Sequence, residues 1–280
     1  MTPLVLDDVL KKIHALPSLQ TVVMELLASI DQDDTHIGDL AFKIEQDQAL
    51  TAKTLRLANS SFYGMQRQIT TIEEAIATLG FRTVRGVVTA AALTGFFANS
   101  QQAAFEVTPF WRHAIATAVC ARELAPYLQL NPEHAYTTGL LHDIGRLVLA
   151  TQFPTHYKAT MAYGAQHDCS LLIAERTVLG LDHAVVGHAL TRHWKFPETI
   201  QQALATHHAP LGQVPNPMQL VVIAADAIAH ALDLSMEQND AVPLLPPGIW
   251  KQLAISDSDL LQVFAKVEAQ FARASLVLDT

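Results

Sequence analysis

Cysteine is scarce in this 280-residue chain, and its scarcity excludes two classes of protein. Cys120 and Cys169 are the only cysteines, and no CxxC pair occurs. A disulfide scaffold and a zinc site built from thiolates both need more cysteines at short spacings, so neither is expected. Both cysteines lie in apolar stretches. We therefore expect two unpaired, buried thiols in a reducing compartment.

Positive charge is also scarce. Lysine and arginine together number 18 against 27 aspartates and glutamates, which gives a net charge of −9. A protein whose main task is to grip nucleic acid or anionic lipid carries a strongly basic surface instead. We therefore expect no nucleic-acid partner.

Long apolar runs are missing as well. The weakly charged stretch 86–102 is interrupted by Gly95, Asn99 and Ser100. It falls short of the roughly 20 residues that a membrane span needs. The N-terminal residues include acidic side chains where a signal peptide carries basic ones. The sequence thus predicts a cytoplasmic protein with no membrane partner.

Apolar residues recur at intervals of three and four along most of the chain, which is typical of helices, and no alternating strand pattern is found. Thr71 and Glu74 match a capping box, and Gly80 is suited to end the short helix that follows it. Further helices are expected at 81–98, 110–128, 132–150, 154–167, 171–179, 183–194, 197–207, 217–232 and 257–274. The predicted fold class is therefore all-α.

The helical periodicity is lost between residues 101 and 108 and resumes after Pro109. We take this break as the main internal boundary. It divides the chain into an N-terminal helical subdomain, residues 1–105, and a second helical subdomain, residues 106–280.

Histidine is abundant, with 13 residues, and one of them is followed directly by an aspartate, His142-Asp143. Neighbouring helical residues point about 100° apart, so one cation could lie between this imidazole and this carboxylate. Such ligands suit Fe, Mn, Zn and similar ions. Arg146 lies on the same helix face as His142 and would suit a phosphate. Taken alone, however, the doublet is better explained as an ordinary polar helix end.

Other residues of the same kind change that interpretation. His113 and His183 each begin a long apolar helix, and His207-His208 ends another. Asp226 is the acidic residue of an otherwise apolar helix, where a carboxylate is costly to bury unless it is paired or bound to a cation. His188 and His193 are interpreted as ordinary helix residues.

The order of these residues over about residues 109–230 resembles the HD superfamily of metal-dependent phosphohydrolases. The resemblance implies one ion held by His113, His142, Asp143 and Asp226. It implies a second ion held by His183, by His207 or His208, and by the bridging Asp143. In relatives that hold a third metal, a glutamate stands where this chain has Pro109. Arg146 replaces the usual lysine, and the Gly-Tyr-Pro signature of enzymes that cleave cyclic dinucleotides is missing.

The N-terminal region is similar to the core of the HDOD domain, an HD relative that acts as a signalling output module. The residues that carry this similarity are Asp47, Leu50, Lys53, Leu55, Arg56, Ala58, Asn59, Ser60, Tyr63, Gly64, Ile72, Ala75, Ile76, Leu79 and Gly80. They include no nucleophile, general base or phosphate-binding loop. The resemblance implies an HD-type helical bundle with an HDOD-like N-terminal subdomain.

Two functions follow as hypotheses. In the first, one or two divalent transition-metal ions (Fe, Mn, Zn or Ni) activate water to hydrolyse an unidentified phosphate ester, with Asp143 and Arg146 as catalytic residues. In the alternative, the chain is a non-catalytic HDOD signalling module with a structural or sensing metal. A phosphate-containing small molecule is the expected ligand, and a protein partner is expected at the N-terminal subdomain.

Overall fold

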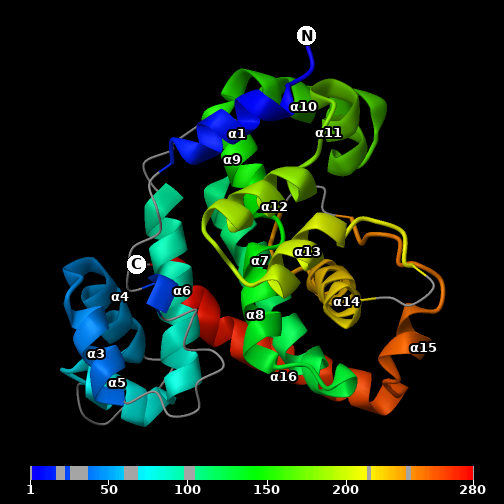
Figure 1. The fold of residues 1–280 in the computed structure, drawn as a ribbon. Coiled ribbons are helices and arrows are strands. Elements are labelled where there is room, and N and C mark those ends of the chain that lie inside the picture. The colour runs from blue at the N-terminus through cyan, green and yellow to red at the C-terminus, as the bar shows by residue number, and fades with distance from the viewer. Residues whose placement is uncertain are drawn as a thin grey trace. The chain divides into compact units, whose positions relative to one another are not determined.

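The computed structural model describes residues 2–16, 23–25, 37–59, 69–97, 105–212, 216–237 and 241–279. Within these ranges every regular element is a helix, which confirms the predicted all-α class (Figure 1). The α-helices are α1 (Leu6–His14), α3 (Ile37–Glu45), α4 (Gln48–Ala58), α5 (Ile72–Leu79), α6 (Phe81–Phe97), α7 (Val107–Leu124), α8 (Pro132–Leu141), α9 (Ile144–Gln152), α10 (Pro154–His167), α11 (Leu171–Leu179), α12 (His183–His193), α13 (Glu198–Thr206), α14 (Pro217–Ala231), α15 (Ile249–Leu253) and α16 (Asp257–Ala274). The described ranges also contain the 3₁₀ helices η3 (Ala125–Leu128) and η4 (Ser275–Asp279).

The chain forms two compact units. The first consists of Met1–Ser18 and Ser100–Phe264, and the second of Leu19–Asn99 and Ala265–Thr280. Each unit therefore takes residues from both halves of the chain, whereas the sequence-based division used two continuous ranges, 1–105 and 106–280.

The second unit is built from α3, α4, α5 and α6, which pack on one another, with η4 against α4 and α6 (Figure 1). The predicted cap is present at α5, because Thr71 Oγ1 accepts a hydrogen bond from the Glu74 backbone N–H at 3.1 Å. The Glu74 carboxylate accepts in return from the Thr70 N–H, one residue earlier than the capping box predicts. Gly80 ends the helix with a φ of 85°, a conformation that favours glycine.

Asn59 holds together the two ends of the segment that follows α4. Its side-chain N–H groups donate to the Leu55 and Ile69 carbonyls, at 2.9 and 2.6 Å, and its Oδ1 accepts from Ile69 N at 2.7 Å. Asn59 therefore caps the Leu55 carbonyl at the end of α4. Three other residues of the HDOD-like pattern, Ser60, Tyr63 and Gly64, lie outside the described residues.

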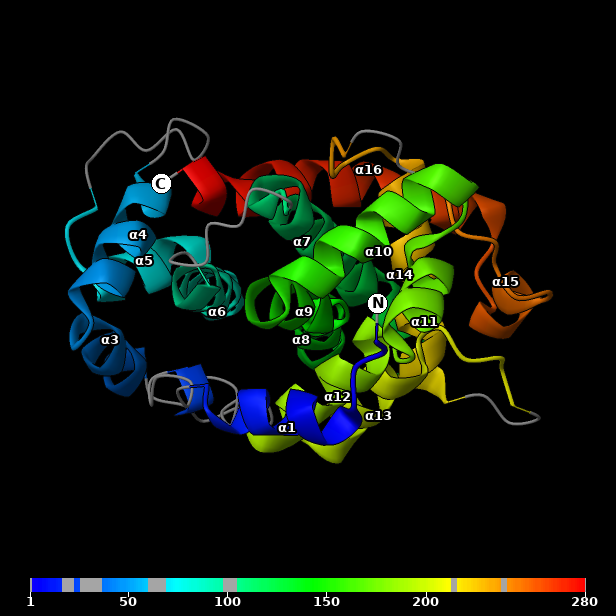
Figure 2. The same cartoon turned by 90° about the horizontal axis from the view of Figure 1, so that it is seen from above.

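The first unit is centred on α7, which packs against α8 and α14, while α12 packs against α9 and α13 (Figure 2). α1 lies along α12, and the Leu4 N–H donates to the Leu179 carbonyl at 2.9 Å. Two glycines permit the closest approaches between these helices. A Cβ on Gly139 would lie 2.8 Å from Ala118 Cα, and a Cβ on Gly145 would lie 2.0 Å from the His183 carbonyl oxygen.

Three expectations need correction. The helix predicted at 132–150 is two helices, α8 and α9, separated by His142 and Asp143. The apolar periodicity continues across this break, so the sequence pattern does not indicate that the helix ends there. α7 begins at Val107, two residues before the predicted boundary at Pro109, because proline is tolerated within the first turn of a helix. Cys169 is only half-buried, whereas Cys120 is buried as predicted, and both are free thiols.

Within the described part of the chain, no single helix combines the length and the apolar composition of a membrane span. Only a bent pair, α5 with the first part of α6, satisfies both criteria together, with an angle of 118° between the two helices.

Candidate metal centre

The break between α8 and α9 places His142 and Asp143 side by side in the core of the first unit. The His142 ring Nδ1 donates to the Gly139 carbonyl at 2.7 Å, one turn back in α8. Asp143 takes a non-helical conformation, with φ −101° and ψ 9°, at the residue before α9 begins. Both side chains are more than nine-tenths buried. The local backbone therefore turns an adjacent imidazole and carboxylate into the same buried space.

His183 is positioned by the start of α12. Asp182 caps this helix, since its side chain accepts from Val185 N at 3.1 Å, and Arg176 holds the same carboxylate at 2.7 Å. His183 is therefore the first residue of the helix. Its backbone N–H and its ring Nδ1 both donate to Glu175 Oε2, at 2.9 and 2.6 Å. The Glu175 carboxylate is fully buried and fixes the direction in which the ring points.

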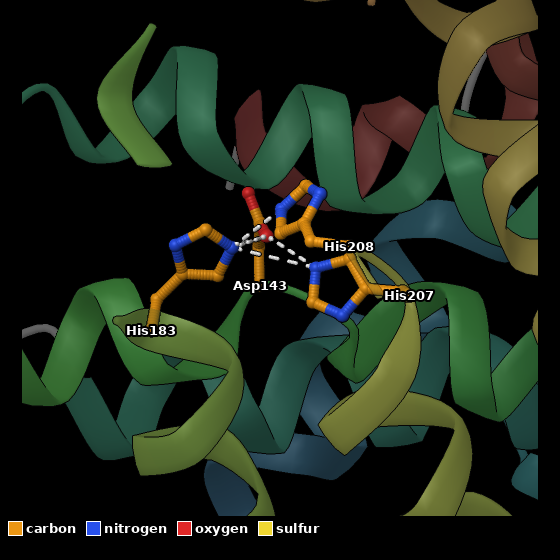
Figure 3. A group of neighbouring side chains, drawn as sticks. All are labelled: Asp143, His183, His207 and His208. Carbon is orange, nitrogen blue, oxygen red and sulfur yellow. Dashed lines mark hydrogen bonds and ion pairs between the residues drawn. The ribbon is translucent and has the colours of Figure 1, made fainter. Parts of the chain in front are cut away.

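One group of possible ligands surrounds Asp143 (Figure 3). We call it the Asp143 group; it contains Asp143, His183, His207 and His208. Asp143 Oδ1 lies 3.1 Å from His183 Nε2 and 3.6 Å from His207 Nε2. His183 Nε2 also lies 2.9 Å from His208 Nε2. Three ring nitrogens from two separate helix ends thus converge on one carboxylate.

A second group, the Asp226 group, contains His113, Asp226 and His230. Asp226 Oδ1 lies 3.0 Å from His113 Nε2 and 3.3 Å from His230 Nε2. The two groups are linked by a third combination, His113, His142 and Asp143. Together they make one continuous His–Asp cluster, which consists of His113, His142, Asp143, His183, His207, His208, Asp226 and His230.

The hydrogen bonds around the cluster determine which ring nitrogens face its centre. A backbone carbonyl can only accept, so Nδ1 of His142 and Nδ1 of His207 must both carry hydrogen, with Gly139 and Leu204 as their acceptors. In a neutral ring this leaves Nε2 as a lone pair directed at the cluster. Several lone pairs and two carboxylates facing one another cannot satisfy each other by hydrogen bonds alone. A cation among them removes this conflict, so the donor set fits a metal ion.

The protonation states agree with this picture. Burial lowers the pKa of His142 to about 4, although Asp143 and Asp226 oppose the shift, so the ring is neutral at pH 7. Burial also lowers the pKa of His208, to about 2, and His207 and His183 add to the effect. Burial acts to raise the pKa of Asp143 and of Asp226, but the surrounding imidazoles hold both well below the ordinary value. Asp143 and Asp226 are therefore ionised and His142 and His208 are neutral, the forms that bind metals.

The pKa of His183 shifts in the opposite direction from those of His142 and His208. Burial acts to lower its pKa, but the carboxylates of Glu175 and Asp143 outweigh burial and raise it to about 10. Without a metal ion, His183 is therefore an imidazolium that donates from both nitrogens. A cation bound at Nε2 would replace this proton, so metal binding at the Asp143 group is expected to release it.

Arg146 contacts the cluster through the second carboxylate oxygen of Asp143. Its Nη1 donates to Asp143 Oδ2 at 3.1 Å, and its Nη2 lies 3.6 Å from Glu237 Oε1. Its guanidinium carbon also lies 5.7 Å from the centre of the Phe110 ring. The predicted contact of Arg146 with a phosphate stays a prediction, because the described contacts of this side chain are with protein groups.

The structure brings together all seven residues predicted as ligands, although their binding of metal stays a prediction. These are His113, His142, Asp143, His183, His207, His208 and Asp226. His188 and His193 belong to none of the ligand groups found among the described residues, in line with their interpretation as ordinary residues.

Two residues of the centre were not assigned from the sequence. Glu175 is an acidic residue in the apolar stretch that forms α11, and the criterion applied to Asp226 would have identified it. His230 lies four residues after Asp226, and this spacing signals a shared helix face.

Comparison with known proteins supports the fold and the family. The HDOD domain model matches residues 16–210. An uncharacterized protein of Treponema pallidum (strain Nichols) is 25% identical over 199 residues, which is 70% of this chain and 38% of that protein. The chain thus spans about two fifths of the length of this relative.

Solved structures that resemble nearly the whole chain include the two that follow. An HDOD domain protein of unknown function from Geobacter sulfurreducens has a TM-score of 0.78 at 23% identity, and 98% of each chain is covered. A protein of Shewanella amazonensis SB2B, described provisionally as a phosphohydrolase, has a TM-score of 0.67 at 26% identity, with 92% of this chain and 97% of that chain covered.

Proposed function

Because the chain belongs to the HDOD domain family and retains a buried His–Asp cluster, we propose that it is a metal-dependent phosphohydrolase acting on a phosphate ester. The observation that carries this proposal is the convergence of three ring nitrogens, those of His183, His207 and His208, on Asp143. The resemblance to the Shewanella protein described as a phosphohydrolase supports it.

The proposed cofactor is one or two divalent transition-metal ions, Fe, Mn, Zn or Ni, since imidazole and carboxylate ligands suit these ions. The residues proposed to hold them are His113, His142, Asp143, His183, His207, His208 and Asp226. When bound, such ions supply Lewis-acid activation of water and of a phosphoryl oxygen.

Asp143 has the central role in this proposal. Its Oδ1 is within 3.6 Å of the Nε2 atoms of His142 and His183, so it is the ligand that would be shared between the two groups. Its Oδ2 is held by Arg146, which therefore orients the shared carboxylate. Arg146 also places a permanent positive charge beside this carboxylate, and we propose that it stabilises charge on a bound phosphate.

The test is hydrolysis of generic phosphate esters by the full chain. The protein is stripped with a chelator, reloaded separately with Mn²⁺, Fe²⁺, Zn²⁺ or Ni²⁺, and assayed with a nitrophenyl phosphate monoester and diester. At least one metal is expected to restore hydrolysis, Asp143→Asn is expected to abolish it, and His188→Ala is expected to leave it intact. Hydrolysis that is equal in the wild type and in Asp143→Asn, or absent with every metal, would overturn the proposal.

A second candidate is a non-catalytic HDOD module in which the metal is structural or sensing. It is favoured by the engagement of Arg146 with Asp143 and Glu237, because a guanidinium held by two carboxylates is less open to a substrate phosphate. In this case metal would raise the thermal stability of the chain without any hydrolysis. The protein partner would then bind through the N-terminal subdomain, residues 1–105.

A further inference from the structure

His230 is a polar residue at the outer edge of the His–Asp cluster. It lies one helical turn after Asp226 in α14, so both side chains project from the same helix face. The His230 side chain is 18% exposed and the Asp226 side chain 12% exposed, whereas His113 is buried on the inner side. His230 therefore lies between the buried carboxylate and the surface of the protein.

The distances around Asp226 match those between ligands of one ion. Two ligands at about 2.1 Å from a metal lie about 3.0–3.4 Å apart for angles between octahedral and tetrahedral values. Nε2 of His113 and Nε2 of His230 lie 3.0 and 3.3 Å from the same atom, Asp226 Oδ1. The rings of His113 and His230 lie beside each other, with their centres 4.4 Å apart and their planes tilted by 37°.

The neighbouring His142 completes this arrangement. Its Nε2 lies 3.3 Å from His113 Nε2 and 3.7 Å from Asp226 Oδ1, and its Nδ1 is occupied by the Gly139 carbonyl. Three imidazoles from α7, from the end of α8 and from α14 thus surround one carboxylate oxygen.

We infer that His230 is a further metal ligand, which adds a third imidazole to the ion position of His113, His142 and Asp226. This inference rests on the proposed function, and it concerns a residue outside the ligand set assigned there. One more protein ligand at this position leaves one fewer coordination site for water or phosphate.

The alternative role for His230 is to donate a hydrogen bond to Asp226 without touching the metal. Glutamine at this position separates the two roles, because an amide N–H can still donate to Asp226 Oδ1 whereas an amide is a much poorer ligand than imidazole for a transition metal. His230→Gln and His230→Ala therefore form an informative pair. His188→Ala is the matched control, since His188 is a partly buried histidine of the same unit outside the cluster.

The experiment measures Co²⁺ binding to the full-length wild type and to these three variants. Equilibrium dialysis gives stoichiometry and affinity, and the visible absorption of bound Co²⁺ reports its coordination. Because loss of a group that merely supports a ligand weakens metal binding about 10–100-fold, loss of His230 is expected to weaken one Co²⁺ by about tenfold or more. Both His230 variants should show this loss with an altered spectrum, and His188→Ala should match the wild type.

Three outcomes would overturn the inference. If both His230 variants bind Co²⁺ with wild-type affinity and spectrum, His230 is not a ligand although the proposed centre stands. If His230→Gln restores what His230→Ala loses, the residue acts through a hydrogen bond to Asp226. If the wild type itself binds no Co²⁺, the inference and the metal-dependent function fail together.

Discussion

The closest approach between two helices at the metal centre is made at Gly145, and it yields the most quantitative prediction. A Cβ at this position would lie 2.0 Å from the His183 carbonyl oxygen and 2.7 Å from Gly187 N. Ordinary contacts begin near 3.4 Å, so in Gly145→Ala the helices α9 and α12 must separate by about 1 Å or more. The obstructing atoms are backbone atoms and cannot rotate away.

Overpacking of this kind costs about 1–3 kcal/mol, and a clash with rigid backbone belongs at the upper end. At about 2–4 °C per kcal/mol for a protein of this size, a cost of about 3 kcal/mol in Gly145→Ala should lower Tm by roughly 6–12 °C. The same movement separates His183 Nε2 from Asp143 Oδ1, which now lie 3.1 Å apart. Metal sites tolerate errors of about 0.2 Å in ligand distance, so metal affinity should fall as well.

The assay combines thermal unfolding of the chelated protein with metal titration. Gly164→Ala is the matched control, because a Cβ there would meet Ala174 Cβ and the Cys169 carbonyl at 3.6 Å, an ordinary contact. The control should keep the wild-type metal affinity, with Tm unchanged or higher because alanine favours the helix. A Gly145→Ala protein with wild-type Tm and metal affinity would refute the proposed packing of α9 on α12.

Three further predictions concern single residues. In thermal unfolding of the chelated protein, Glu175→Gln should be more destabilising at pH 6 than at pH 10. Burial lowers the pKa of His183, but Glu175 and Asp143 outweigh burial and raise it from 6.5 to about 10. The ion pair of His183 with Glu175 therefore contributes fully to stability below pH 6.5, and its contribution is lost as the pH rises through 10. A loss of stability that does not change with pH would contradict this role. Asn59→Ala should cost about 1–3 kcal/mol in denaturant unfolding, since it leaves the Ile69 backbone groups without their partners, and Asn59→Asp should cost less because it keeps the acceptor for Ile69 N. In the native protein a thiol reagent should modify the half-buried Cys169 but not Cys120, whose pKa is raised by complete burial; equal reactivity would contradict the packing around Cys120.

Much of the fold could be predicted because its signals are local. The capping residue Thr71 and the terminal Gly80 identified the ends of α5, and proline or apolar spacing identified α10, α11 and α16. The break between α8 and α9 could not be predicted in this way, because apolar residues continue through it. The two residues at the break, His142 and Asp143, belong to the cluster, and that is a property of the tertiary structure.

The candidate site was predictable where a carboxylate that is unfavourable to bury lies in an apolar segment of the sequence. Asp226 was identified because an isolated carboxylate in an apolar helix needs a partner, and the partners are His113 and His230. Glu175 satisfies the same criterion, but its partner His183 belongs to the next helix, and only the folded chain shows the 2.6 Å contact between them. The orientation of Arg146 toward Asp143 and Glu237 likewise depends on how α9 packs, which the spacing of residues does not specify.

The central claim is that the His–Asp cluster binds a divalent transition metal, and metal content tests it most directly. The full chain, purified without chelator, is analysed for Fe, Mn, Zn and Ni beside Asp143→Ala and His188→Ala, and each protein is then chelated and retitrated while Tm is followed. We predict at least about one equivalent of metal in the wild type and in His188→Ala, and a loss of metal in Asp143→Ala. The Tm of the wild type and of His188→Ala should rise when metal is added back, because a metal that binds the folded state stabilises it. Wild-type protein that contains none of these metals and gains no thermal stability from any of them would contradict the claim.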